Sequence, residues 1–291
     1  MTNGTQRRSS LSAEWAAPGL LSCWCPSCGI NPVRCRQRPR RCCFACLPGQ
    51  RRSRQAHDGR VSYRERPTAV AGAVLWERAV GPSPTPVPIL PDGCLDLLWD
   101  GNRLFVAGPD TMARWHQSDP GACYVALRFS GGMGPGLLGV PADELRDRSP
   151  RLDELWPSAE ARLLAERVAG EPVAALEAWA LQRAGAREPD PLGRRVFWMA
   201  AAGTPVAEMA RRTGLSARQL HRRCLPLFGY GPRRLARVLR LGRALEAARQ
   251  GTSLAQVAAN CGYADQAHLS REVRALAGLT PAALLQELGR R

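Results

Sequence analysis

The C-terminal part of the sequence contains one pattern twice, between Thr204 and Pro281. Gly214 in the first copy corresponds to Gly262 in the second, 48 positions on, and Arg222 corresponds to Arg271, 49 positions on. A repeat of this length indicates that one supersecondary unit is used twice. This feature restricts the fold more than any other, because both copies must form the same small structure.

Each copy of the repeat predicts a helix-turn-helix. A first helix has apolar residues at i, i+3 and i+4 spacing, starting at Val206 in one copy and at Leu254 in the other. Gly214 and Gly262 then end these helices, because glycine readily takes the left-handed conformation found at a helix C-terminus. A second helix follows each glycine and would be the recognition helix of a DNA-binding unit.

Capping signals mark where several of these helices begin. Ser216 with Gln219, and Ser253 with Gln256, have the spacing of a capping box, in which each side chain bonds the backbone N–H of the other residue. Pro226 lies inside the second helix of the first copy. Proline removes a backbone donor, so we expect that helix to end just before it.

A helix from Pro232 to about Arg249 is expected between the two copies. Leucine and valine form its apolar side, and six arginines are spread along it. Eighteen residues at ~1.5 Å each give ~27 Å. With flanking turns, such a helix can hold two recognition helices about 34 Å apart, one turn of DNA. The competing interpretation is a helical domain that binds protein, with its arginines solvated.

The charge distribution separates the C-terminal part from the rest. The chain of 291 residues has a net charge of +16 and contains no lysine. Residues 61–190 contain 13 Arg and 18 acidic residues, whereas residues 191–291 contain 17 Arg and 5 acidic residues. This asymmetry predicts a polyanion partner for the C-terminal part, and the alternative is a solvated basic surface.

Residues 1–60 show neither a helix nor a strand period and contain seven of the eleven cysteines. Two C-x2-C pairs, at Cys25 and Cys43, have a spacing close to that of a zinc ribbon. The residues between them are rich in arginine and proline and show no strand pattern. We therefore expect a disordered or spurious leader, with translation starting at Val61, and no bound metal or cofactor.

Residues 61–155 predict a compact β-rich domain. Turn residues such as Asp100-Gly101 separate short apolar segments. The predicted strands are 72–76, 87–90, 94–99, 104–107 and 124–129. Short helical turns are expected over 136–145, and residues 156–190 are expected to form a helical connector and linker.

The middle of the chain gives little support for catalysis. Cys94, Cys123 and His116 are dispersed, and His116 is expected in a loop. No G-x-S-x-G or P-loop motif is present in the sequence. We therefore predict no catalytic residue and no enzyme activity.

The doubled unit resembles the DNA-binding domain of the AraC/XylS family of bacterial transcription regulators. The resemblance covers about residues 192–288, and its sharpest part is Gly262-Tyr263, Asp265 to Arg271, Gly278 and Thr280-Pro281. It implies an α+β chain, with a β-rich N-terminal sensor-like domain and an all-α DNA-binding domain of two helix-turn-helix units in residues 191–291. The segment 91–109 resembles an uncharacterised domain that often precedes this module.

The resemblance also implies which residues contact DNA. The base-contacting residues would be Arg218, His221, Arg222, Gln266, Ala267, His268 and Arg271. The residues that contact phosphates would be Ser216, Arg223, Arg233, Arg234, Ser253 and Arg274. Arginine can bond guanine O6 and N7, and glutamine can bond adenine N6 and N7. For each arginine a phosphate contact stays open, and Arg271 could instead pair with Glu272 or Asp265.

The expected partner is double-stranded DNA, read at a bipartite site in successive major grooves by a cytoplasmic regulator. RNA polymerase and an unidentified small-molecule effector are further candidate partners, and residues 61–155 are a candidate homodimer interface. The sequence contains no run of 18 apolar residues and therefore predicts no membrane span. The alternative is a methyl-accepting DNA-alkylation repair protein with an N-terminal Cys–zinc site, although the C-x3-C pair of such proteins is missing here.

Overall fold

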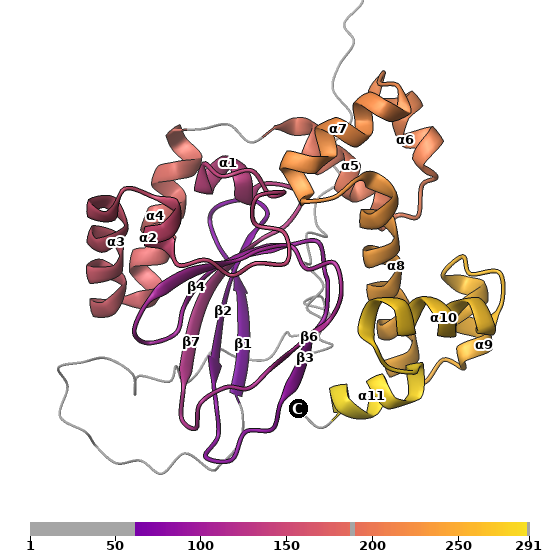
Figure 1. Cartoon of the computed structure of the whole chain (residues 1–291), viewed down its shortest axis with the longest axis horizontal. Helices are drawn as coiled ribbons and strands as arrows, with labels where there is room; N and C mark the ends of the chain where they lie inside the picture. The colour runs from indigo at the N-terminus through magenta and orange to yellow at the C-terminus, as the bar shows by residue number, and fades with distance from the viewer. Residues whose placement is uncertain (1–61, 187–189, 290–291) are drawn as a thin grey trace, which may run out of the picture.

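The structure is a computed structural model that describes residues 62–186 and 190–289 (Figure 1). Five strands form an antiparallel sheet in the order β1-β2-β7-β4-β5, and β3 pairs with β6 in a separate two-stranded ribbon. The strands are β1 (Ser62–Pro67), β2 (Ala73–Ala79), β3 (Val87–Ile89), β4 (Leu95–Trp99), β5 (Leu104–Ala107), β6 (Arg114–His116) and β7 (Cys123–Phe129).

The two faces of the sheet have different environments. Leu75, Leu97 and Leu127 lie side by side in register and are fully buried on one face. Because side chains alternate along a strand, Trp76 and Ala126 face the other side, where a smaller apolar cluster includes Tyr63, Leu98, Phe105 and Tyr124. The first face is covered by helices, and the second face lines a cavity.

Helices cover the first face of the sheet. They are α1 (Gly134–Leu138), α2 (Leu152–Leu155), α3 (Ser158–Gly170) and α4 (Pro172–Ala186). Val168 of α3 and Trp179 of α4 belong to the same core as Leu127 and Phe129, and the rings of Phe129 and Trp179 lie 6.2 Å apart. The segment expected to be a connector thus contributes two helices to this core: α4 packs on β7, and α3 packs on α4.

The C-terminal part is helical, as predicted from the repeat. Its helices are α5 (Pro191–Ala201), α6 (Val206–Thr213), α7 (Ala217–Phe228), α8 (Pro232–Arg249), α9 (Leu254–Asn260), α10 (Gln266–Ala277) and α11 (Pro281–Gly289). Helices α6 and α7 form the first helix-turn-helix, and α9 and α10 form the second, at the two ends of α8 (Figure 1). The predicted α+β organisation, a β-rich N-terminal part followed by two helix-turn-helix units, is confirmed.

Helix α8 holds the two units because each half of it belongs to a different core. Leu235 and Val238 pack with Met209, Leu220 and Phe228 in the first unit. Leu241 and Leu245 pack with Val257, Leu269, Val273 and Leu276 in the second unit. The helix spans the predicted residues, and its period places both sets of apolar side chains inside.

A buried carboxylate joins α8 to α10. Only 7% of the Glu272 side chain is exposed, and its Oε atoms lie 3.3 Å from Arg237 Nε and 2.7 Å from Arg240 Nη2. The Arg240 guanidinium also lies over the ring of Tyr263, 4.5 Å from its centroid. These contacts fix the second recognition helix to the spacer helix by charge as well as by apolar packing.

Two predictions about helix ends are wrong. Helix α7 does not stop before Pro226 but continues to Phe228 and ends at Gly229, which has φ 75°. A proline in the last turn costs only one backbone hydrogen bond there, which explains why the helix tolerates it. Ser253 caps α9, but the Gln256 side chain bonds Asn260 at 2.8 Å, so the second half of that capping box is absent.

The elements that sequence patterns did not predict are β1, β6, α2 and α5. The predicted loop around His116 is strand β6, which pairs with β3. The five predicted strands are confirmed with small shifts at their ends, and the capping box of Ser216 and Gln219 is complete. The leader of residues 1–60, Val61 and part of the predicted linker lie outside the described residues.

The β-rich part contacts both helix-turn-helix units near the C-terminal ends of their recognition helices. The Ala142 N–H donates to Pro226 O at 2.9 Å, near the end of α7, and the Ala113 N–H donates to Leu276 O at 2.7 Å, near the end of α10. Arg146 adds a bond to Gly229 O at 3.2 Å. The segment 109–148 therefore touches the C-terminal end of each recognition helix.

Gly229 and Gly278 offer a test of the joint, the contact between the segment 109–148 and the ends of the recognition helices. Both end a recognition helix with a left-handed φ, 75° and 72°. A Cβ at Gly229 would lie 2.5 Å from Pro109 Cγ, whereas a Cβ at Gly278 would meet nothing within 4 Å. We expect Gly278→Ala to lower the free energy of unfolding by about 1 kcal/mol through backbone strain, and Gly229→Ala by at least about 1 kcal/mol more through the clash. Urea unfolding followed by circular dichroism measures both, and equal losses would contradict the contact.

Glu272 offers a test of the charge contact between α8 and α10. We expect Glu272→Ala to lower the free energy of unfolding by about 2 kcal/mol, less than a fully buried pair because both arginines are partly exposed. The control is Glu166→Ala, which breaks an exposed pair with Arg162 at 3.7 Å and should cost at most about 1 kcal/mol. The same urea unfolding compares the two variants, and a loss no greater than the control's would show that Glu272 does not hold the helices together.

Candidate nucleic-acid interface

The helices α7 and α10 occupy equivalent places in the two units. Each follows a turn containing a glycine of left-handed φ, Gly214 at 69° and Gly262 at 76°. Ser216 caps α7, and Asp265 caps α10 by accepting the His268 N–H at 2.6 Å. The cap at Asp265 was not predicted, although Asp is a common N-cap residue. Both helices therefore begin with their first turns at the surface.

On α7, the three predicted base-contacting residues are exposed. Arg218 and Arg222 have no ion-pair partner in the part of the chain that the structure describes. The His221 ring lies against Gly231, where a Cβ would come within 2.2 Å of His221 Nδ1. The arginines are thus available to a ligand, while His221 is also a packing residue at the start of α8.

On α10, the predicted residues differ in their surroundings. Gln266, Ala267 and Arg271 are exposed. His268 is half-buried, accepts the Ala264 N–H at 3.2 Å through Nδ1 and meets the ring of Tyr263 edge-on at 5.3 Å. His268 is therefore held in the turn of the second unit and points toward its own domain.

The alternative partners for Arg271 are not used. Glu272 pairs with Arg237 and Arg240 of α8, and Asp265 is occupied as a helix cap. Within residues 62–186 and 190–289, the Arg271 guanidinium forms no ion pair. Its charge is therefore uncompensated at the surface of α10.

The residues predicted to contact phosphates also divide into two groups. Arg223 pairs with Asp190 at 2.7 Å, and Arg234 donates to Thr111 O at 3.3 Å. Arg233 and Arg274 are exposed and form no ion pair with other described residues. Ser216 and Ser253 cap α7 and α9, so their hydroxyls already accept backbone N–H groups.

The two cysteines of the helical part are core residues. Burial raises the pKa of Cys224 to about 12, and burial also raises the pKa of Cys261. A thiol with a raised pKa is a poor nucleophile. Among the described residues no cluster of three or more potential metal ligands is found, and the cysteine pairs of the leader lie outside those residues.

Family models match both parts of the chain. A family model described as a helix-turn-helix domain matches residues 209–287. A model described as a domain of unknown function, DUF6597, matches residues 73–151. No match was found among curated proteins. Of the helices in the described ranges, none has the length and apolar character needed to cross a membrane.

Solved structures resemble this chain at low sequence identity. One is a probable AraC family transcriptional regulator from Rhodopseudomonas palustris, with 24% identity, a TM-score of 0.31, and coverage of 34% of this chain and 98% of that chain. Another is apo ToxT from Vibrio cholerae, with 10% identity, a TM-score of 0.41, and coverage of 76% and 100%. ToxT with a bound unsaturated fatty acid has 11% identity, a TM-score of 0.40, and coverage of 71% and 95%.

The family match covers the two units that the repeat predicted, and nothing in these comparisons supports the alternative of an alkylation-repair protein. Residues 209–287 of this chain therefore form a helix-turn-helix domain, as the repeat predicted.

Proposed function

We propose that the chain is a sequence-specific transcription regulator that reads a bipartite DNA site with α7 and α10. The observation that carries this proposal is the set of exposed arginines without ion-pair partners among the described residues: Arg218 and Arg222 on α7, and Arg271 on α10. Each lies in the first or second turn of a capped recognition helix, where side chains of this motif reach base edges.

The two recognition helices would enter successive major grooves on one face of the duplex. Helix α8 has 18 residues, so its length is ~27 Å, and with the flanking turns it approaches the ~34 Å of one duplex turn. Because α8 belongs to both apolar cores, the spacing between the units is rigid. One subunit would therefore recognise two half-sites at a fixed distance.

Specific residues have different proposed roles in this complex. Arg222 and Arg271 would bond guanine O6 and N7, Gln266 would bond adenine, and Ala267 would contact a thymine methyl group. Arg218 and His221 lie beside Arg222 and would add to readout in the first half-site. We propose that His268 positions the turn of the second unit instead of contacting a base.

Phosphate contacts would come from groups that are still free. Arg233 and Arg274 are the proposed side-chain contacts, together with the helix N-termini capped by Ser216 and Ser253. Arg223 and Arg234 are engaged by Asp190 and Thr111. These two would bind phosphate only after those contacts are released.

The β-rich part is the proposed sensor. We propose that residues 61–155 act together with α3 and α4 as one sensor-like domain, and that residues 191–291 form the DNA-binding domain. The regulator would act in the cytoplasm by binding and not by catalysis. An effector, RNA polymerase and a second copy of the chain through residues 61–155 are its proposed partners.

Arginine variants test base readout on a site selected from random duplexes by the full chain. We expect Arg222→Ala and Arg271→Ala each to weaken binding to the selected site by ~1–3 kcal/mol and to weaken binding to random duplex much less. Arg233→Ala should weaken both equally, because phosphate contacts carry no sequence information. Arg162→Ala, an exposed arginine of α3, controls for lost charge. Gel-shift titration measures the affinities, and equal losses on both duplexes would reassign Arg222 and Arg271 to phosphates.

Spacing variants of the selected site test the rigid arrangement on α8. Inserting five base pairs between the half-sites turns the second one to the opposite face of the duplex. Inserting about ten restores the face but adds ~34 Å, which α8 cannot span. We expect either insertion to reduce affinity to that of a single half-site. Footprinting that still shows one protein protecting both half-sites after the ten-base-pair insertion would exclude the rigid arrangement.

A further inference from the structure

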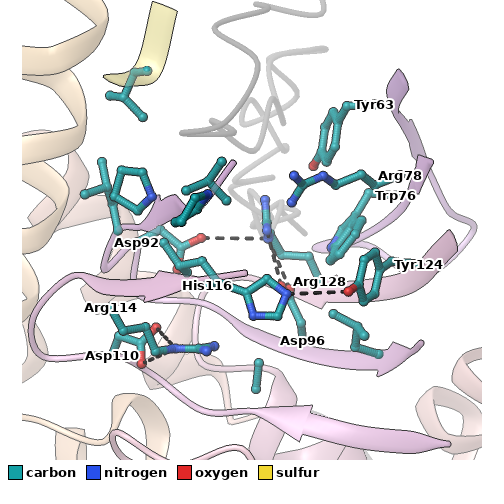
Figure 2. A pocket seen from close by; sticks show the side chains of 18 of the residues that line it. Tyr63, Trp76, Arg78, Asp92, Asp96, Asp110, Arg114, His116, Tyr124 and Arg128 are labelled. Carbon is teal, nitrogen blue, oxygen red and sulfur yellow. Dashed lines mark hydrogen bonds and ion pairs between the residues drawn. The ribbon is translucent and has the colours of Figure 1, made fainter. Parts of the chain in front are cut away.

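A cavity of about 760 Å³ lies between the β-rich part and the last helices of the chain. Its walls come from the second face of the sheet, from the β3–β6 ribbon and from the ends of α8 and α11, where Arg249 and Leu288 line it. Cavities of this size hold small organic ligands. The side chains from the sheet and ribbon are shown in Figure 2.

Most charges in the walls of this cavity are compensated. Arg128 lies 3.1 Å from Asp96, 3.7 Å from Asp92 and 3.3 Å from Glu65. Arg114 pairs with Asp110 at 3.1 Å. These ion pairs satisfy the walls themselves, so neither of these arginines is the obvious site for a ligand.

Arg78 of β2 differs from the other arginines of the sheet. It is half-buried, and its guanidinium has no ion-pair partner in the described part of the chain. Burial lowers the pKa of Arg78, and the groups that oppose this shift are the phenols of Tyr124 and Tyr63, not a carboxylate. A guanidinium that has lost water without gaining an anion raises the free energy of the fold, and a bound anion would remove that cost.

Aromatic rings surround Arg78. Tyr63 and Trp76 are stacked with their centroids 5.8 Å apart, and His116 meets Tyr124 edge-on at 6.2 Å. In Figure 2, Tyr63, Trp76, Arg78 and Tyr124 lie together on one side of the cavity, across from Asp92. Burial, followed by the charges of Arg114 and Arg78, lowers the pKa of His116, which favours the neutral ring. This part of the cavity is therefore lined by aromatic rings. Arg128 lies 5.8 Å from the centroid of the Trp76 ring but is paired with carboxylates, whereas Arg78 has no ion-pair partner among the described residues.

We propose that this cavity binds a small aromatic carboxylate, with the carboxylate on Arg78 and the ring against Trp76 and Tyr124. The planar guanidinium can bond both oxygens of a carboxylate, and the indole and phenol rings provide surfaces for an aromatic body. Carboxylates already neutralise Arg128, so an anion in the cavity is attracted to Arg78 and not to Arg128. This binding does not depend on DNA.

The same ligand would connect the two parts of the chain. Arg249, at the end of α8, lines the cavity, and its Nη1 is buried without a hydrogen-bond partner among the described residues. Leu288 of α11 lines it too and belongs to the apolar core of the second helix-turn-helix unit, with Leu90, the residue after β3. A ligand in the cavity would therefore lie next to α8 and α11, where the β-rich part contacts the second helix-turn-helix unit. That this regulates DNA binding rests on the proposed function.

The test uses the full chain without DNA, titrated by calorimetry with 2-naphthoate, with benzoate and with the matched amides 2-naphthamide and benzamide. We expect at least one carboxylate to bind, and its amide to bind at least ~10-fold more weakly because the amide lacks the charge that Arg78 requires. Inorganic phosphate, an anion without a ring, should bind more weakly than that carboxylate. If neither carboxylate binds more tightly than its amide, the proposal is wrong.

Variants of Arg78 locate the site. Arg78→Gln should weaken carboxylate binding ~10-fold or more, and Arg78→Lys should restore part of it. Arg103→Gln, an exposed arginine of the turn before β5, should leave it unchanged. Without ligand, the melting temperature of Arg78→Gln should equal or exceed that of the wild type, because a desolvated charge is removed. Unchanged binding to Arg78→Gln would overturn the assignment. Failure of the gel-shift experiments would overturn the regulator function and leave this binding result intact.

Discussion

The contact of Glu272 with Arg237 and Arg240 determines how the second helix-turn-helix unit is used. A carboxylate on the inner side of α10 draws two arginines of α8 inward, where their charge is neutralised. Residue 271, one position earlier on the same helix, is turned to the outer side and keeps its charge. Because consecutive residues of a helix point in different directions, Glu272 forms a structural ion pair while the charge of Arg271 stays available to a ligand.

The arginine-only composition of the chain hides this division of roles. Every basic side chain is an arginine, and each can equally serve as a helix clamp, a domain contact or a DNA ligand. Arg243 bonds the carbonyls of Ala200 and Ala201 at the end of α5, so it serves as a clamp. Arg222, on the exposed side of α7, has no such partner in the described chain. Burial and partner assign the role, and residue type alone does not.

The sequence predicted what depends on neighbours along the chain and missed what depends on distant ones. The spacer α8, the turns at Gly214 and Gly262 and the cap at Ser216 follow from local periods and backbone preferences. The short strand β6 has only three residues and no alternation, and it exists because β3 pairs with it. Likewise, the engagement of Arg234 by Thr111 joins residues 123 positions apart. No local pattern in the sequence encodes such a pair.

The joint between the two parts acts on the helix-turn-helix units through their backbones. The last carbonyls of a helix have no partner inside the helix. In α7 and α10, one such carbonyl each, at Pro226 and Leu276, accepts an N–H from the segment 109–148. The same segment also carries β6 and Arg114, which line the cavity. A shift of this segment would therefore move both recognition helices near their C-terminal ends while α8 keeps their spacing. Such coupling would change the orientation of the pair relative to the β-rich part without disturbing the distance between half-sites.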